Sequence, residues 1–344
     1  MKNELTFNIP FSGFDSVTFI NCFASTYMFL ENIEAVRERS VALQESYFFL
    51  FDTMCGCSSL RSRFDGQPTE MQKMIGETDF YGCGTENNVE FLFGFAGYEY
   101  HRLTDPAMFK DEIFASIDAG KPVITKVKTG GSRFRVITGY DGDALICPDF
   151  AHAQVKPQGA LSYDELDILY LIGDKSEPRY TLIDGLKRIR QVMEYNINEN
   201  LWASYIEKMG LYTSDSLANA DLEEKKARMK RVADAMWHTF NCHNFAEVFR
   251  KYRDGGDAAV YDMIGDMKKL HEPGLKELWD KISHCCGYTH DLAWALIGLE
   301  ECADWSKHAA GYFGEMVELT LFRIAKNDVD AFDAIKQAIE RLSE

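Results

Sequence analysis

The chain has 344 residues, of which 46% are hydrophobic and 13% aromatic, a composition that indicates an ordered globular protein and excludes a disordered one. Its 37 basic and 54 acidic residues give a formal net charge of −17, which argues against nucleic acid and anionic membrane surfaces as general partners. No signal segment or apolar run of about 18 residues occurs, so we expect a cytoplasmic protein that does not insert into membranes.

The first predicted element is a helix that Asn21 can cap, with apolar residues at three-to-four spacing (Phe23, Tyr27, Met28 and Leu30). Cys22 then lies in its first turn. Unpaired backbone N–H groups and the helix dipole favour a thiolate at that position. By itself this is a weak indication of a nucleophile, because buried structural cysteines are common.

The next elements favour a mixed α/β arrangement. Residues 111–119 are predicted to form a helix that Gly120 ends, and residues 122–127 a β-branched strand. Two strands over residues 134–140 and 144–147 follow, separated by Asp141-Gly142-Asp143, and a last strand covers residues 168–172. Because Asp-Gly between apolar runs is typical of a tight turn, we predict a hairpin there.

After about Leu182 the sequence has helical periodicity and almost no β-rich runs. The short polar stretch of residues 175–179 separates the two patterns. We therefore predict two domains, one over residues 1–175 and an all-α accessory domain over residues 176–344.

Five segments of the first half form a recognisable series: INCFASTYMFLENI, FLFDTMCGCSSLRSRFDG, GKPVITKV, RFRVITGYDGDALICPDF and SYDEL. The series resembles the bacteriocin-processing peptidase domains of the papain-like superfamily, and especially the N-terminal domain of the butirosin-biosynthesis acyltransferase family (butirosin biosynthesis protein H). The resemblance covers about half of the chain. It implies an α+β fold of the papain-like cysteine-peptidase type with an antiparallel sheet, followed here by the all-α domain.

The resemblance also implies roles for single residues. Cys22 matches the nucleophile that opens the first helix, and Asp149 matches the acid that orients the catalytic base. Where the family has its histidine, this chain has Arg133, and Ser16 stands where some families place an oxyanion-binding glutamine. Arginine cannot accept a proton in this pH range, so it cannot serve as the general base.

Three interpretations of Cys22 follow. In the first, another histidine, His152 or His101, reaches the thiol in space and acts as the base. In the second, Arg133 stabilises a thiolate that attacks an activated acyl group without a base. In the third, the protein is an inactive homologue that binds a ligand, because losing one member of a catalytic unit removes most of its activity.

If the protein is active, Cys22 attacks an acyl carbon, and water or an amine resolves the acyl-enzyme. The resemblance implies a peptide or an acyl thioester on a carrier as substrate, and a role in peptide or natural-product biosynthesis. The alternative is a catalytically inactive peptide-binding or carrier-binding module. The net charge of −17 favours a basic peptide over an acidic carrier.

No cofactor is expected, since the glycine-rich stretches lack the Lys-Ser/Thr of a phosphate-binding loop. The nine cysteines are odd in number and irregularly spaced, so we expect reduced thiols. Two groups come closest to metal-ligand patterns: Cys55, Cys57 and Cys83; and His238, Cys242 and His243 with His284, Cys285, Cys286 and His290. The first lacks a second closely spaced pair, and the apolar neighbours of the second suit a helical core, so we expect no metal.

Overall fold

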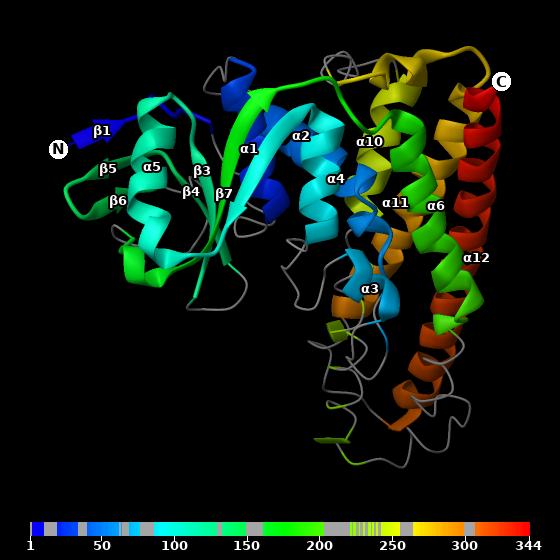
Figure 1. The fold of residues 1–344 in the computed structure, drawn as a ribbon. Helices are drawn as coiled ribbons and strands as arrows, with labels where there is room; N and C mark the ends of the chain where they lie inside the picture. The colour runs from blue at the N-terminus through cyan, green and yellow to red at the C-terminus, as the bar shows by residue number, and fades with distance from the viewer. Residues whose placement is uncertain are drawn as a thin grey trace. The chain divides into compact units, whose positions relative to one another are not determined.

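The structure is a computed structural model (Figure 1). It describes residues 2–9, 19–33, 40–61, 63, 69–75, 86–128, 133–148, 161–202, 221, 223–224, 227, 230, 233–234, 236, 239, 242–254, 264–298 and 307–344. The chain forms two compact units. Unit 1 comprises Met1–Phe51, Ile75–Thr181 and Val260–Met267, and unit 2 comprises Asp52–Met74, Leu182–Ala259 and Lys268–Glu344.

Unit 1 contains a four-stranded sheet with strand order β2-β7-β3-β4, in which all neighbours are antiparallel. Its strands are β2 (Tyr98–Leu103), β3 (Val123–Val127), β4 (Arg133–Ile137) and β7 (Leu166–Lys175). Residue Thr125 pairs with Arg135 of β4 on one side and with Leu169 of β7 on the other. β4 is therefore an edge strand of this sheet.

A smaller sheet has the order β1-β5-β6, with β1 (Lys2–Glu4), β5 (Gly139–Asp141) and β6 (Ala144–Ile146). The predicted hairpin is confirmed: β5 and β6 pair antiparallel, with Asp141 opposite Ala144. Gly142 in the turn has φ +61°, a backbone conformation that glycine adopts without strain. The predicted strand of residues 134–140, however, is divided at Thr138 between the two sheets.

Helices cover both faces of the four-stranded sheet (Figure 1). The helix α5 (Phe109–Asp118) lies on one face, and α1 (Phe19–Leu30) and α4 (Glu86–Ala96) lie on the other. As predicted, Gly120 follows α5 with φ +79°, and its N–H donates to the carbonyl of Ile117. The helix α2 (Ser40–Met54) runs from unit 1 into the first residues of unit 2.

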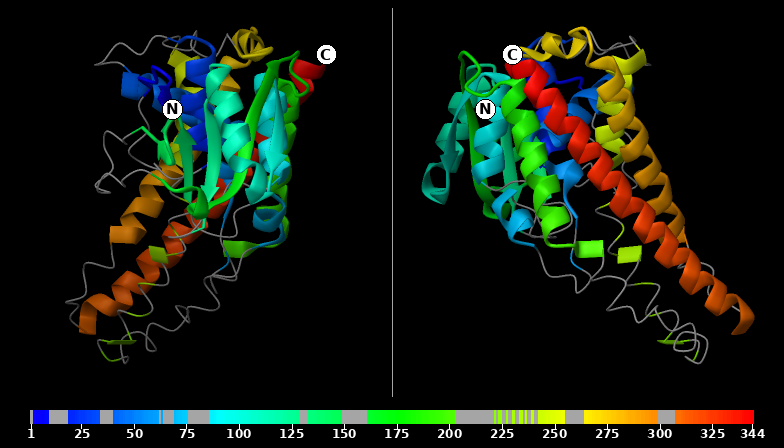
Figure 2. Two further views of the ribbon diagram at one scale, coloured as in Figure 1. Left: turned by 60° about the vertical axis from the view of Figure 1, so that its left-hand side comes forward. Right: turned by 90° about the vertical axis from the view of Figure 1, so that its right-hand side faces the viewer.

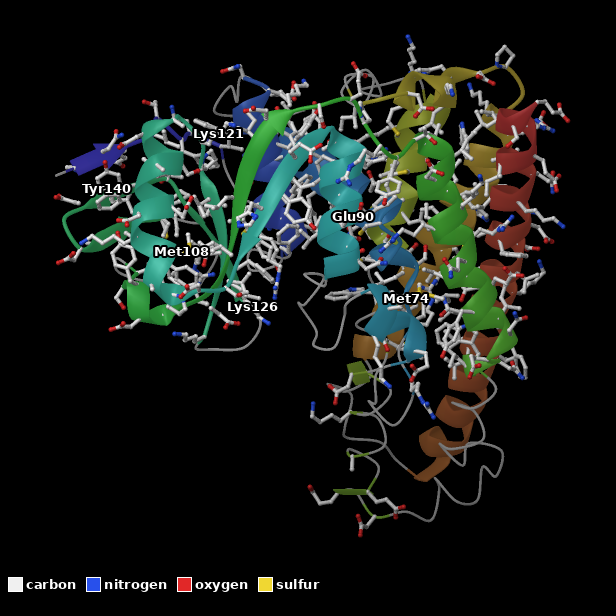
Figure 3. All side chains as sticks on the ribbon, viewed as in Figure 1. Met74, Glu90, Met108, Lys121, Lys126 and Tyr140 are labelled. Atoms are coloured by element: carbon white, nitrogen blue, oxygen red, sulfur yellow. The ribbon has the colours of Figure 1, made fainter. Side chains whose placement is uncertain are left out.

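Each face of the sheet has its own core. On the α5 side, twelve buried residues form one cluster: Leu103, Phe109, Ile113, Ile117, Val123, Val127, Ile137, Tyr140, Leu145, Leu161, Leu166 and Leu169. Tyr140, labelled in Figure 3, stacks on Phe114 and donates a 2.8 Å hydrogen bond to Asp118. On the α1 side the core is aromatic, and Phe19 contacts Phe134 edge-on with ring centroids 5.4 Å apart.

The described part of unit 2 contains helices and no strand. Its longer helices are α6 (Leu182–Asn198), α10 (Cys242–Asp254), α11 (Lys276–Gly298) and α12 (Lys307–Ser343), with the short α3 (Glu70–Ile75) beginning in this unit. α11 lies between α10 and α12 and packs against both, as Figure 2 shows for α11 and α12.

The expected mixture of helices and antiparallel sheet, followed by a helical region, is confirmed. The predicted domain boundary lies between residues 175 and 176, whereas the compact units change over between Thr181 and Leu182, and Asp52–Met74 belongs to the helical unit. Among the described residues, none of the helices has the length and apolarity needed to cross a membrane.

Candidate functional site

Cys22 lies inside α1 and is fully buried. The helix already includes Phe19 and Ile20, so the prediction that Asn21 caps it is wrong. Asn21 is instead buried, and its side-chain oxygen accepts a 2.7 Å hydrogen bond from Nε2 of Gln44 in α2, which also donates to Ser25 Oγ at 3.0 Å. These bonds satisfy polar groups in the interior and hold α1 against α2.

Aromatic side chains hold the segment around Cys22 against the sheet. Phe19 packs edge-on against Phe134 of β4 and Tyr170 of β7, with ring centroids 5.4 and 5.2 Å apart. Phe23 makes similar edge contacts with Phe51 of α2 and Phe93 of α4, at 5.0 and 4.9 Å. Such edge-to-face pairs add to the burial energy of each ring, so the position of α1 on the sheet is well determined.

Among the described residues, Arg135 is a cation that acts on Cys22. Arg135 is buried in β4, and its Nη1 donates a 2.8 Å hydrogen bond to the carbonyl of Phe134 on its own strand. A second thiol, Cys147, acts on Cys22 and also interacts with Arg135. Cys147 directly follows β6. Gly139 pairs with Ile146, so extending this register by one pair sets Cys147 opposite Thr138, the residue between β4 and β5. We call Cys22, Arg135 and Cys147 the thiol–arginine cluster.

Burial dominates the electrostatics of this cluster. Loss of solvation raises the pKa of Cys22 from 9.0 to about 12, and the opposing effects of the Arg135 charge and of the Cys22 backbone amide are smaller. Burial likewise raises the pKa of Cys147 to about 12, again against a lowering by Arg135. A low-dielectric environment disfavours the charged thiolate more than one guanidinium stabilises it. Burial therefore opposes the thiolate that is expected at Cys22.

The other predicted site residues are distributed as follows. Arg133 is the first residue of β4 and pairs with Val127, and its side chain lies outside the described part, as do Asp149, His152 and Ser16. His101 is exposed in β2, whereas α1 contacts β4 and β3, so three strand spacings separate β2 from β4. At about 4.8 Å per spacing, β2 lies about 14 Å from β4 across the sheet.

Sequence reasoning overlooked Arg135 and Cys147. Strand alternation contained a usable signal, since Arg135 lies two residues after Arg133 and so starts from the same face of β4. The predicted hairpin contained a second signal. Extending its register by one pair brings Cys147 opposite Thr138, which directly follows β4. Arg133 was predicted from the resemblance alone. A resemblance identifies the position that matches the family's histidine, but it does not indicate which nearby residues also approach the thiol.

The cysteines and histidines considered as metal ligands are mostly held in other contacts. Cys55 donates to the carbonyl of Asp52, and the sulfur of Cys242 lies 2.8 Å from Nη2 of Arg61. Cys83 and His238 are outside the described part. His243 and His290 do come together, with ring centroids 4.8 Å apart, and burial and the neighbouring His290 lower the pKa of His243. No set of three His, Cys, Asp or Glu side chains among the described residues is arranged to hold a metal ion.

No family model matches the chain, and no curated protein matches it significantly.

Proposed function

We propose that unit 1 is a papain-like domain that binds a peptide or an acyl-thioester carrier ligand, and that its Cys22 does not act as a base-activated nucleophile. The support is the antiparallel sheet with α1 packed on its β4 edge, and Cys22 in that helix at the position which the sequence resemblance gives to the nucleophile. The negative charge of −17 favours a basic peptide as the ligand.

The observation that carries this proposal is the environment of the Cys22 thiol. Burial raises the pKa of Cys22 to about 12, so the protonated thiol predominates at pH 7. Such a thiol needs a base within hydrogen-bond reach to react. In the part of the chain that the structure describes, the charged side chain that acts on it is Arg135, which cannot accept a proton. Binding without turnover is the function that this arrangement supports best.

A second candidate function rests on the same cluster. Arg135 lowers the pKa of Cys22, so a movement that exposes the thiol would leave the guanidinium as the main influence on it. The thiolate would then attack a thioester carbonyl, the C–S bond would break, and the carrier thiolate would leave. An amine would finally take the acyl group from Cys22 as an amide, releasing the thiol.

Alkylation of the native protein separates the two candidates. We would treat it with iodoacetamide from pH 6 to 9 and quantify each cysteine by peptide mass spectrometry, with the urea-unfolded protein as the reference for full reactivity. We expect Cys22 to stay unmodified until the chain unfolds, because burial protects it and keeps it protonated. If Cys22 reacts rapidly at pH 6 and this reaction disappears in Arg135→Gln, the acyl-transfer function is favoured.

Binding is tested with two probes, S-acetyl-N-acetylcysteamine as a minimal acyl thioester and a lysine-rich dodecapeptide as a basic peptide. Isothermal titration calorimetry should detect one of them, and the same amount should be recovered unchanged by mass spectrometry. Cys22→Ala should bind equally well. Turnover of the thioester that Cys22→Ala abolishes would replace the binding function with acyl transfer, and the absence of saturable binding to both probes would refute the proposed ligand classes.

A further inference from the structure

Two histidines face each other between the helices α10 and α11 of unit 2. The ring centroids of His243 and His290 are 4.8 Å apart, and their planes are inclined by 43°. Both residues are partly buried, so solvent reaches this part of the interface. The spacing is set by the helix packing itself, because Ser283 Oγ donates to the carbonyl of Ala246 at 3.2 Å and Trp279 packs on Phe249 at 4.9 Å.

This spacing fits two imidazoles that share one metal ion. A ring nitrogen lies about 2.0–2.1 Å from a bound zinc ion, and the ring centre lies about 1.1 Å beyond the nitrogen, so two tetrahedrally placed rings have centres about 5 Å apart. The observed distance is 4.8 Å. We propose that His243 and His290 form a two-imidazole site for a divalent transition-metal ion of the Co²⁺, Ni²⁺ or Zn²⁺ type, which imidazole nitrogen prefers.

A carboxylate lies near this pair. Glu247 is four residues after His243 on α10, hence on the same face of the helix. Its Oε1 accepts a 2.9 Å hydrogen bond from Nε of Arg250, and its Oε2 accepts another from Nη2 of the same side chain. While Arg250 holds it, Glu247 is engaged, so the two imidazoles supply the protein ligands and water completes the coordination.

The neighbouring thiols are poor competitors for the ion. Cys242 and Cys286 are both buried, whereas His243 and His290 are partly exposed to solvent. The sulfur of Cys242 is also in contact with Arg61. The proposed site is therefore a nitrogen site, and this property can be seen spectroscopically.

The test is a titration of the full-length reduced protein with Co²⁺, whose visible spectrum reports coordination and shows an added charge-transfer band when thiolate binds. We expect saturable binding of one ion without that band. His243→Ala and His290→Gln should each weaken binding by at least about tenfold. Arg250→Gln should strengthen binding, because it releases Glu247 as a third ligand. The matched control is His284→Ala, an exposed histidine of α11, which should bind as the unaltered protein does.

Circular dichroism of each variant verifies that the helices remain folded, so that a loss of binding reports the site. Three outcomes would overturn the proposal: no saturable binding, binding that His243→Ala and His290→Gln leave unchanged, or a thiolate charge-transfer band at saturation. The last two would assign the ion to other residues of the chain.

Discussion

Nη2 of Arg61 donates a 2.7 Å hydrogen bond to Oδ1 of Asp328, and both side chains are almost completely buried in unit 2. The other carboxylate oxygen accepts a 3.1 Å hydrogen bond from the indole N–H of Trp202. Nη1 of Arg61 donates to the carbonyl of Leu60 at 2.9 Å. The Asp328 charge raises the pKa of Arg61 despite burial, so the guanidinium stays charged. This ion pair joins α12 to the segment that follows α2.

Removing one member of this pair should strongly destabilise unit 2. Asp328→Ala leaves the Arg61 charge buried without its carboxylate, which costs about 3–5 kcal/mol in unfolding free energy. Urea denaturation followed by circular dichroism measures this loss. Asp330→Ala is the matched control on the same helix, because it removes the Lys326–Asp330 pair, which is far more exposed than Arg61–Asp328, and should have a much smaller effect. Equal effects of the two substitutions would contradict the structural importance of the buried pair.

The sequence predicted those elements whose signal is local. Asp141-Gly142-Asp143 identifies the β5–β6 turn, and Gly120 identifies the end of α5, because each glycine adopts a positive φ that other residues avoid. The start of α1 was missed for the converse reason. Asn21 has the residue type of a helix cap, but its amide is used in a tertiary hydrogen bond to Gln44, which local propensity cannot indicate.

Long-range partners were beyond sequence reasoning. Arg61 and Asp328 are 267 positions apart, and nothing in either local sequence indicates the other. The candidate site was located in part: Cys22 was identified, whereas the burial that sets its pKa depends on packing by several elements. The pairing of His243 with His290 was considered only as part of a larger group, because helix periodicity does not define which faces of two helices meet.

Alkaline pH should destabilise the protein through its buried thiols. Burial raises the pKa of Cys22 from 9.0 to about 12. Its stabilising contribution to the free energy of unfolding is therefore fully present below pH 9 and is lost as the pH rises toward 12. Each pH unit in that interval costs up to about 1.4 kcal/mol, since only the unfolded chain releases the proton. Cys147 and the buried Tyr27 and Tyr47 act in the same direction.

The contribution of Cys22 itself is obtained by difference. Urea unfolding at pH 8, 9 and 10 should show a shallower decline of stability with pH in Cys22→Ala than in the unaltered protein, by up to about 1.4 kcal/mol between pH 9 and 10. Parallel curves would indicate that Cys22 has an ordinary pKa, and would weaken the argument for an unreactive thiol.

The side chains of Asn21 and Gln44 should stabilise the fold as a hydrogen-bonded pair. Gln44→Met leaves the buried Asn21 amide without this 2.7 Å partner and should lower the unfolding free energy by about 1–3 kcal/mol. Adding Asn21→Leu to Gln44→Met also removes the buried amide that has lost this bond, so the double variant should be less destabilised than the sum of the two single variants. Urea unfolding of all four proteins gives the coupling energy, and strict additivity would show that the bond contributes little.

Two glycines inside helices of unit 2 should respond to alanine in opposite ways. At Gly287 in α11, an added Cβ lies 3.8 Å from the Cβ of Ala246, which is ordinary contact, so Gly287→Ala should gain up to about 1 kcal/mol in helix propensity. At Gly185 in α6, the added Cβ lies 2.8 Å from Sδ of the buried Met54. Moving that side chain in a packed core costs about 1–3 kcal/mol, which outweighs the propensity gain. Thermal unfolding should therefore give a higher midpoint for Gly287→Ala and a lower one for Gly185→Ala, and a rise in both would mean that the contact between α6 and Met54 is looser than the structure indicates.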